Sequence, residues 1–371
     1  MRKTELATPC LVLEVALLER NLATMQAAAT RAGKRLRPHA KTHKCSALAR
    51  RQLAAGARGV CVAKVAEAAG LVAAGLSDVL VTGPVVAPAR IERLVALLAA
   101  APDLLAVVDC AEAVVRLDAA LRAAGRTLGV LLDVDVGLHR TGVAPAVAPA
   151  LAAAVRACPT LRLRGVQAYA GHVQHLRDYA ARRDASRACL AAAVPVFRVL
   201  HAADPACDIF STTGTGTFDI DLAVPEVTEL QVGSYVCMDA EYRGIGSAAD
   251  ATQNTTFAPA LRLLTTVVSA NQPGFVTVDA GLKALYRDGG KPLVYDAAAG
   301  TPTVGLAYDW FGDEYGRLTA APGTPAPRLG DVLELIPAHC DPTINLFDRF
   351  HLCRGDDVVG EWPIDLRGCS Q

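Results

Sequence analysis

The chain has 371 residues, with 37 basic and 37 acidic side chains, 52% hydrophobic residues and 5% aromatic ones. This length predicts roughly two domains of about 150 residues each. The balanced charge gives no electrostatic attraction to nucleic acid or to an anionic membrane surface, so we expect neither as a partner. The scarcity of aromatic residues favours helices layered on sheets over an aromatic-rich β-sandwich.

The spacing of the cysteines and the composition of the N-terminal residues indicate the cellular compartment of the protein. None of the 11 cysteines forms a C-x-x-C pair, which is typical of reduced thiols in a cytoplasmic protein. Glu5, Thr8 and Pro9 interrupt the start of the chain, so it offers no apolar signal-peptide core. No apolar run reaches the roughly 18 residues of a membrane span. We therefore expect a soluble, cytoplasmic protein.

Between residues 35 and 236 the sequence alternates short apolar runs with Ala-, Leu- and Arg-rich stretches of helical periodicity. The runs cover residues 35–41, 59–64, 78–83, 105–109, 129–137, 163–171, 208–214 and 229–236. Eight strands with helices between them predict an α/β fold, a (β/α)8 barrel of the TIM type. A doubly wound open sheet is the alternative.

After residue 255 the pattern changes to short strands separated by Gly, Pro and Asp turns. We expect strands within residues 261–270, 274–281, 301–307, 331–339 and 358–364. They predict a second, smaller β-strand domain, made of residues 1–11 and 251–371, beside a barrel of residues 12–250. The N-terminal run CLVLEV could belong to either part.

The end of the first barrel strand carries a candidate nucleophile, because barrel enzymes place their sites at the carboxyl ends of the strands. Side chains alternate along a strand, so Arg35, Arg37, His39, Lys41 and His43 share one face. A lysine at a barrel mouth, flanked by other cations, has a depressed pKa and can act as an amine nucleophile. A solvated basic strand end is the alternative.

The ends of the seventh and eighth strands carry a candidate phosphate site. Gly214, Thr215, Gly216 and Thr217 follow the seventh strand, and Tyr235 ends the eighth. Glycines let backbone N–H groups approach an anion, and in barrels this is the usual place for a phosphate. A plain turn is the alternative. A reactive lysine and a phosphate cradle on one rim imply a phosphorylated aldehyde cofactor.

The second domain carries a candidate metal site at the end of the strand within residues 331–339. If strand geometry persists, His339 and Asp341 point the same way and Cys340 points oppositely. An imidazole and a carboxylate can hold one divalent ion together, although a hydrogen-bonded pair at a turn is the alternative. Asp133 and Asp135 could also hold a metal, but pairing with arginines such as Arg140 is favoured.

Several longer motifs carry a family resemblance that extends from about residue 7 to residue 365. In order they are TPCLVLEV, RPHAKTHKC, VDVGLHRTGV, GVQAYAGHVQH, TGTGT, ELQVGSYVCMDAEY, VDAGLKAL, GDEYG and PAHCDPTINLFD. Together they resemble the D-threonine aldolase and D-serine dehydratase family, whose fold is that of alanine racemase. The segments around Lys41 and around His339 are the most specific.

The resemblance implies a role for each candidate residue. Lys41 would form the Schiff base with pyridoxal 5′-phosphate (PLP), and His339 and Asp341 would hold a divalent ion that binds the substrate β-hydroxyl. Arg140 and Tyr169 would lie against the cofactor ring. The phosphate would be surrounded by Gly214, Thr215, Gly216, Thr217 and Tyr235. Members are typically homodimers, which implies a homodimer here.

Two departures from the family pattern stand out. Thr212 and Thr213 replace glycines expected before the Gly-Thr-Gly segment, which implies a tighter phosphate loop. Ala170 stands where the aldolases have a histidine after the tyrosine. His172 has the same strand parity as Ala170, which makes it a candidate proton carrier, with a metal-held hydroxide as the alternative.

The residue at position 341 separates two activities within the family. In the dehydratase branch a cysteine, which suits zinc, stands two residues after the histidine. Asp341 is a hard oxygen ligand that suits Mg²⁺ or Mn²⁺ better than zinc. We therefore expect retro-aldol cleavage of a D-β-hydroxy amino acid, of the D-threonine or 3-hydroxy-D-aspartate type, to glycine and an aldehyde.

Three alternatives stay open. β-Elimination to a keto acid and ammonia, as in a D-serine or 3-hydroxyaspartate dehydratase, needs the same residues with the hydroxyl as leaving group. Racemisation of an alanine-type substrate would not need a metal at His339 and Asp341. A non-enzymatic PLP carrier would be a barrel without a second domain, and this chain has a long β-strand segment after the barrel.

Overall fold

A computed structural model describes residues 1–371, and they divide into two compact units. The barrel unit comprises Met25–Lys41, Leu48–Gly233 and Gly368–Gln371, and the β unit comprises Met1–Thr24, Thr42–Ala47 and Ser234–Arg367. Compact units defined by contacts need not coincide with independently folding domains. The expected division into residues 12–250 and residues 1–11 with 251–371 therefore stays a prediction.

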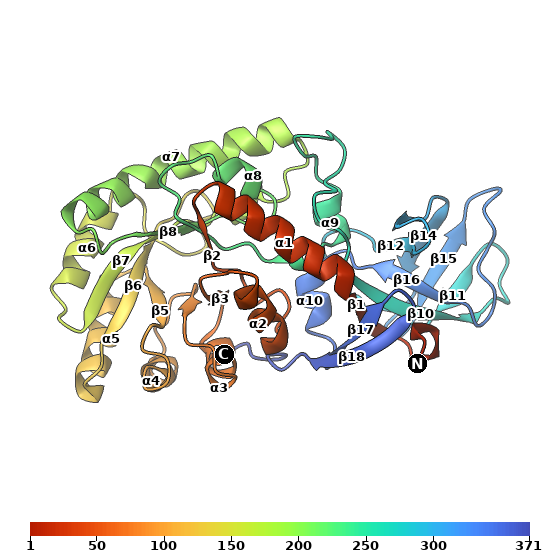
Figure 1. Ribbon diagram of the computed structural model, residues 1–371, viewed down its shortest axis with the longest axis horizontal. Helices are drawn as coiled ribbons and strands as arrows, with labels where there is room; N and C mark the ends of the chain where they lie inside the picture. The colour runs from red at the N-terminus through yellow and green to blue at the C-terminus, as the bar shows by residue number, and fades with distance from the viewer. The chain divides into compact units, whose positions relative to one another are not determined.

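Eight parallel strands form the centre of the barrel unit, in the order β2-β9-β8-β7-β6-β5-β4-β3 (Figure 1). They are β2 (Arg35–Leu36), β3 (Val60–Val62), β4 (Val79–Val81), β5 (Leu105–Val108), β6 (Leu128–Asp133), β7 (Leu161–Gln167), β8 (Ile209–Thr212) and β9 (Glu229–Leu230). A parallel bridge between His39 and Cys61 links the two outer strands, so the sheet is nearly closed. The predicted barrel is confirmed, and the open sheet is excluded.

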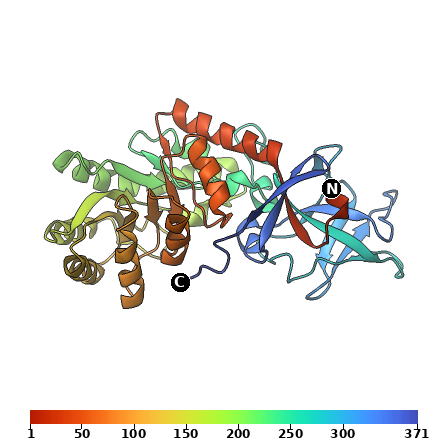
Figure 2. The ribbon, with the colours of Figure 1, turned by 60° about the horizontal axis from the view of Figure 1, so that its bottom comes forward.

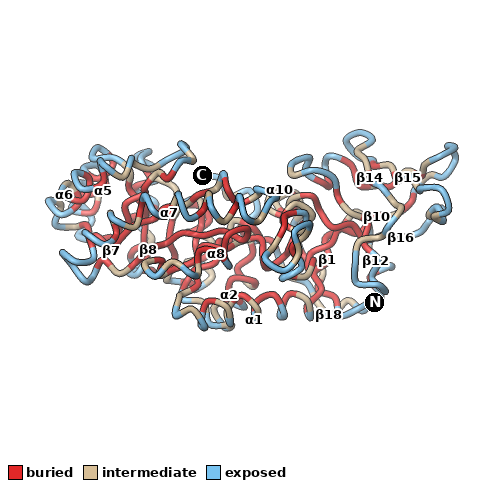
Figure 3. Tube along the Cα trace, turned by 90° about the horizontal axis from the view of Figure 1, so that it is seen from above, coloured by how far each residue is buried: buried red, intermediate tan, exposed pale blue.

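Helices alternate with these strands along the chain (Figure 1). They are α1 (Val15–Arg31), α2 (Ser46–Ala54), α3 (Val65–Ala73), α4 (Pro88–Leu97), α5 (Ala111–Ala124), α6 (Ala148–Arg156), α7 (Tyr179–Ala203) and α8 (Phe218–Asp221). The strands run through a buried core (Figure 3). One cluster in it consists of Cys61, Leu80, Leu105, Val107, Leu131 and Ile209. These small and branched side chains are those that regular barrel layers require.

Helix α7 is the one helix that is long and apolar enough to cross a membrane by length and composition. Its buried residues are Arg182, Ser186, Leu190, Ala193, Phe197 and Leu200. Their spacing of three and four residues marks one face of a helix. Arg182 on this face donates from Nε to the Gly216 carbonyl oxygen at 2.7 Å. This pattern is that of a helix packed along a barrel.

The β unit is built on a ten-stranded sheet whose main order is β13-β12-β16-β10-β1-β17-β18, with β11, β15 and β14 branching from β10. The strands are β1 (Cys10–Glu14), β10 (Leu261–Ser269), β11 (Val276–Val278), β12 (Leu293–Asp296), β13 (Thr301–Pro302), β14 (Leu306–Trp310), β15 (Gly316–Ala320), β16 (Val332–Ile336), β17 (Arg349–Arg354) and β18 (Asp357–Pro363). Two short helices, α9 (Ala240–Arg243) and α10 (Cys340–Ile344), complete the unit.

The N-terminal run that could belong to either part is strand β1 of this sheet (Figure 2). It pairs antiparallel with β10, with Cys10 opposite Leu264, and parallel with β17, with Leu11 opposite Phe350. Four of the five expected strands are present as β10, β11, β16 and β18. The strand expected within residues 301–307 is wrong, because the chain there forms β13 and the start of β14, and β12, β15 and β17 were not predicted. Strand β17 begins and ends with arginine, and its pairing with β1 lies far away in sequence, so local pattern does not reveal it.

Candidate active site

The barrel unit brings most of the predicted PLP residues to one rim. Lys41 follows β2, Arg140 follows β6, Tyr169 follows β7, and the segment 213–217 follows β8. Because the strands are parallel, their carboxyl ends share the rim where barrel enzymes carry their sites. The guanidinium carbon of Arg140 lies 6.0 Å from the centre of the Tyr169 ring. The structure therefore places these candidate residues together at one end of the barrel.

The basic strand end before Lys41 is not a solvated one. Arg37 is 2% exposed, and its Nε donates to Glu229 Oε1 at 2.7 Å while a second nitrogen contacts Asp78. Burial lowers the pKa of Arg37, but the carboxylates of Glu229 and Asp78 more than offset this and hold the pKa above its usual value. Arg37 is therefore a structural cation inside the barrel.

His39 is hydrogen-bonded to the backbone of Lys41. Its Nδ1 accepts from the Lys41 N–H at 3.4 Å, and its Nε2 lies 3.1 Å from the Thr82 hydroxyl. That hydroxyl donates to the Val62 carbonyl oxygen at 3.0 Å, so it accepts from His39. His39 thus accepts from the Lys41 N–H and orients the Lys41 backbone.

The Gly-Thr loop packs tightly against Gln174 and Arg182, to which the sequence assigned no role. The Gly216 N–H donates to Gln174 Oε1 at 3.1 Å, and Arg182 donates to the Gly216 carbonyl oxygen. A Cβ on Gly216 would collide with the Gln174 backbone carbonyl oxygen. Thr213, where a glycine was expected, has a φ of 79°, which is strained for a β-branched residue.

Replacing Gly216 with alanine is expected to destabilise the cofactor-free protein by about 1–3 kcal/mol, because its new methyl group meets backbone that cannot rotate away. Gly214→Ala is the matched control, since its Cβ would meet the end of the Gln174 side chain, which can move. Thermal unfolding should show a clear fall in Tm for Gly216→Ala and a smaller one for the control. Equal Tm values would contradict the tight loop.

A buried carboxylate stands behind the loop. Thr217 Oγ1 donates to Asp221 Oδ2 at 2.6 Å, and Ser186 Oγ donates to Asp221 Oδ1 at 2.6 Å. Burial raises the pKa of Asp221 to about 6. The Thr217 hydroxyl is therefore committed to Asp221 and would offer a phosphate its backbone rather than its side chain. Asp221 belongs to helix α8, and no motif at the loop pointed to it.

His172 does not lie on a strand, so its side-chain direction cannot be inferred from the alternation of side chains along β7. Strand β7 ends at Gln167, and residues Gly171–Val173 form a 3-10 turn, so strand alternation does not extend to His172. His172 is exposed, and its Nε2 lies 3.7 Å from Cys189 Sγ on α7. Its role as proton carrier stays a prediction.

The carboxylates of β6 and the loop after it bind groups of that same loop. Asp135 Oδ2 lies 2.7 Å from His139 Nδ1, and Asp133 Oδ2 accepts from Thr141 Oγ1 at 2.8 Å. No group of three or more His, Cys, Asp or Glu side chains in the structure could hold a metal ion. Asp135 therefore pairs with a histidine of its own loop, whereas Arg140 acts on Asp133: burial raises the pKa of Asp133, and the charge of Arg140 partly offsets this.

In the β unit, His339 and Asp341 lie close together, but the backbone between them is not the strand that the sequence predicted. Strand β16 ends at Ile336, and His339 is the N-cap of helix α10. The expectation that strand geometry persists is therefore wrong. Even so, His339 Nε2 lies 4.0 Å from Asp341 Oδ1. One ion with ligand distances of about 2.1 Å can bridge atoms this far apart.

The surroundings of this pair suit a metal ligand set. Asp288 Oδ2 lies 3.4 Å from His339 Nδ1, so a proton held there leaves Nε2 to face an ion. The Ser234 hydroxyl donates to Asp341 Oδ1 at 3.5 Å. Two protein ligands leave the remaining positions of an ion to water and substrate. Neither Asp288 nor Ser234 has a sequence spacing that would mark it as a partner.

Tyr235 lies in the β unit, whereas the Gly-Thr loop lies in the barrel unit. Its ring is buried and meets the Phe257 ring edge-on, with centres 5.6 Å apart. Its predicted place beside the phosphate stays a prediction.

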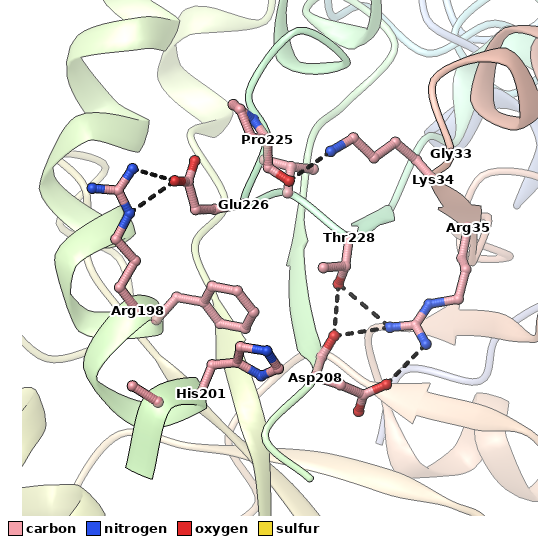
Figure 4. A pocket seen from close by; sticks show the side chains of 12 residues that line it. Gly33, Lys34, Arg35, Arg198, His201, Asp208, Pro225, Glu226 and Thr228 are labelled. Atoms are coloured by element: carbon pink, nitrogen blue, oxygen red, sulfur yellow. Dashed lines mark hydrogen bonds and ion pairs between the residues drawn. The ribbon is translucent and has the colours of Figure 1, made fainter. Parts of the chain in front are cut away.

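A cavity of about 650 Å³ lies within the barrel unit, away from the rim that carries Lys41 (Figure 4). Its lining residues Arg35, Asp208 and Thr228 stand at or just before the starts of β2, β8 and β9. Figure 4 shows its charges paired with each other: Arg35 with Asp208 at 3.0 Å, and Arg198 with Glu226. At this face of a barrel such pairs stabilise the fold rather than take part in catalysis.

Comparison with known proteins identifies the family. Residues 13–241 match the alanine racemase N-terminal domain family, and residues 260–353 match a serine dehydratase domain family. D-threonine aldolase of an Arthrobacter species is 41% identical over 98% of this chain and 93% of its own. 3-Hydroxy-D-aspartate aldolase of Paracoccus denitrificans is 36% identical over 99% of this chain and 94% of its own.

A solved structure shows the same fold over nearly the whole chain. The crystal structure of D-threonine aldolase from Filomicrobium marinum superposes with a TM-score of 0.92 at 36% identity, covering 99% of this chain and 97% of that one. A dehydratase is more distant: D-threo-3-hydroxyaspartate dehydratase of Delftia sp. is 31% identical over 96% of this chain and 97% of its own. The chain therefore belongs to the D-threonine aldolase and D-serine dehydratase family of lyases, as its motifs predicted.

Proposed function

We propose that this lyase cleaves D-β-hydroxy amino acids of the D-threonine or 3-hydroxy-D-aspartate type into glycine and an aldehyde, with PLP and a divalent ion. The observation that carries the proposal is the approach of a hard carboxylate ligand, Asp341, to His339, with 4.0 Å between Oδ1 and Nε2. This donor pair suits Mg²⁺ or Mn²⁺. The relatives named as aldolases are also more similar to this chain than the dehydratase is.

The barrel rim fits PLP. A lysine stands at the carboxyl end of β2, and the loop after β8 contains a glycine at which a side chain would collide with Gln174. Glycines of this kind let backbone N–H groups approach a phosphate. When bound, PLP supplies an electron sink for the bond that breaks. Lys41 would hold the cofactor through its amine, with Arg140 and Tyr169 beside the ring.

The chain's residues would prepare the substrate for cleavage. Lys41 would hold the cofactor until the substrate binds and would stay on the rim afterwards, because His39 holds its backbone N–H. His339 and Asp341 would hold a divalent ion, which would supply a Lewis acid that lowers the pKa of the substrate hydroxyl group. His172 is the proposed proton carrier. Loss of the β-hydroxyl proton allows the Cα–Cβ bond to break, and protonation of Cα then yields glycine.

The purified protein with PLP and Mn²⁺, incubated with D-threonine, 3-hydroxy-D-aspartate or D-serine, tests the proposal. We expect glycine and an aldehyde from one of the first two substrates, and loss of both products after EDTA treatment. Restoration by Mn²⁺ is the control for irreversible damage. A keto acid with ammonia would assign the protein to β-elimination instead, and full activity in EDTA would contradict the metal site. Full activity of His172→Ala would remove His172 from the mechanism.

A further inference from the structure

A buried aspartate of the β unit joins two chain segments that lie far apart in sequence. Asp239 is fully buried, and each of its carboxylate oxygens accepts one backbone N–H. Oδ1 accepts from Tyr242 at 2.9 Å and Oδ2 accepts from Cys340 at 3.1 Å. Asp239 is thus the N-cap of helix α9 and, at the same time, holds the first residue of helix α10.

Backbone hydrogen bonds strengthen the same junction. The Ala240 N–H donates to the Pro337 carbonyl oxygen at 3.0 Å, and the Glu241 N–H donates to the Ala338 carbonyl oxygen at 3.1 Å. The start of α9 therefore runs beside the segment that leaves strand β16. The Asp239 carboxylate adds a third hydrogen bond to this junction by accepting from the Cys340 N–H. Cys340 lies between His339 and Asp341, the two candidate metal ligands.

The backbone conformation at Cys340 determines how far apart the His339 and Asp341 side chains lie. In a continuing strand, the Cα atoms of residues two apart are separated by about 6.6 Å and their side chains leave the backbone side by side. Here the chain turns into a helix at His339, and the ligand atoms lie 4.0 Å apart. The N–H that Asp239 holds is the one at this turn. Asp239 therefore stabilises the backbone geometry that brings the two ligand atoms within reach of one ion.

We propose that Asp239 is a positioning residue for the divalent ion, acting through the Cys340 N–H on His339 and Asp341. The inference rests on the proposed metal-dependent function. It distinguishes Asp239 from an ordinary helix cap, since loss of its carboxylate would weaken ion binding and not only stability. An outer partner of metal ligands typically changes ion affinity by about 10- to 100-fold when it is removed.

Asp239→Asn in the full-length, PLP-loaded protein provides the test. An amide keeps one acceptor oxygen, but its nitrogen cannot accept a hydrogen bond, so one of the two N–H groups loses its partner. We expect Mn²⁺ affinity, measured by titration with electron paramagnetic resonance, to fall about 10-fold or more. Turnover at saturating Mn²⁺ should stay close to that of the wild type.

Asp178→Asn is the matched control, because Asp178 caps α7 by accepting from the Ala181 N–H at 2.7 Å and belongs to the barrel unit. It should leave Mn²⁺ affinity unchanged. If Asp239→Asn does not fold, Asp239→Ser replaces it, since serine caps α9 well but is too short to serve both N–H groups. We expect the same loss of affinity.

The outcomes separate the two proposals. If the wild type binds no Mn²⁺, the proposed function fails and this inference fails with it. If the wild type binds Mn²⁺ and the Asp239 variants bind it equally well, Asp239 is only a cap and the inference alone is overturned. Weaker binding by the Asp239 variants with normal binding by Asp178→Asn supports it.

Discussion

Lys41→Ala is expected to lower the rate of substrate cleavage by about three orders of magnitude or more, because no other amine can replace a covalent nucleophile at that place. Lys41 stands at the carboxyl end of β2, and its N–H is held by His39 Nδ1 at 3.4 Å. Its backbone position is therefore set before any cofactor binds, which makes the rim ready for PLP.

Borohydride reduction followed by mass spectrometry measures the attachment directly. We expect a stable cofactor adduct on Lys41 in the wild type and none at that position in Lys41→Ala. Lys64→Ala is the matched control, since Lys64 is exposed and follows the neighbouring strand β3 on the same rim. It should keep both activity and adduct. An adduct formed on another lysine, with activity retained in Lys41→Ala, would overturn the assignment.

Arg37→Met is expected to destabilise the barrel by about 3–5 kcal/mol, which is the typical cost of leaving one member of a buried ion pair alone. Glu229 has a fully buried side chain and would lose the 2.7 Å hydrogen bond from Arg37 Nε. An unpaired carboxylate in such a place costs far more than the methionine packing returns. Thermal unfolding of the cofactor-free protein should show a fall in Tm that exceeds the one expected for Gly216→Ala.

Arg35→Met is the control for this prediction. The Arg35 side chain is 35% exposed; it pairs with Asp208 at 3.0 Å and only at 3.8 Å with Glu229, so its loss should cost less, about 1 kcal/mol. The double variant Arg37→Met with Glu229→Leu should recover part of the lost stability, because no buried charge is then left unpaired. Equal Tm values for Arg37→Met and Arg35→Met would show that burial does not govern the Arg37 pair.

The barrel and the chain positions of its rim residues followed from the sequence itself. Apolar runs alternating with helical periodicity are local features, and they specify eight strands with intervening helices. Parallel strands place their carboxyl ends on one rim, so Lys41 and the segment 214–217 could be assigned to the same end from order alone. The motifs also identified the family, because the residues around Lys41 and His339 are contiguous.

The tertiary structure alone decided how these residues are held. Asp239 and Cys340 are 101 positions apart, and Arg37 and Glu229 are 192 apart, so no local pattern links them. Strand β1 found its neighbours in β10 and β17, and the chain turned at His339 where alternation predicted a strand. Periodicity records only neighbours along the chain. Contacts that form when distant segments pack together determine the partner of each buried charge. They also determine where a strand ends and a helix begins.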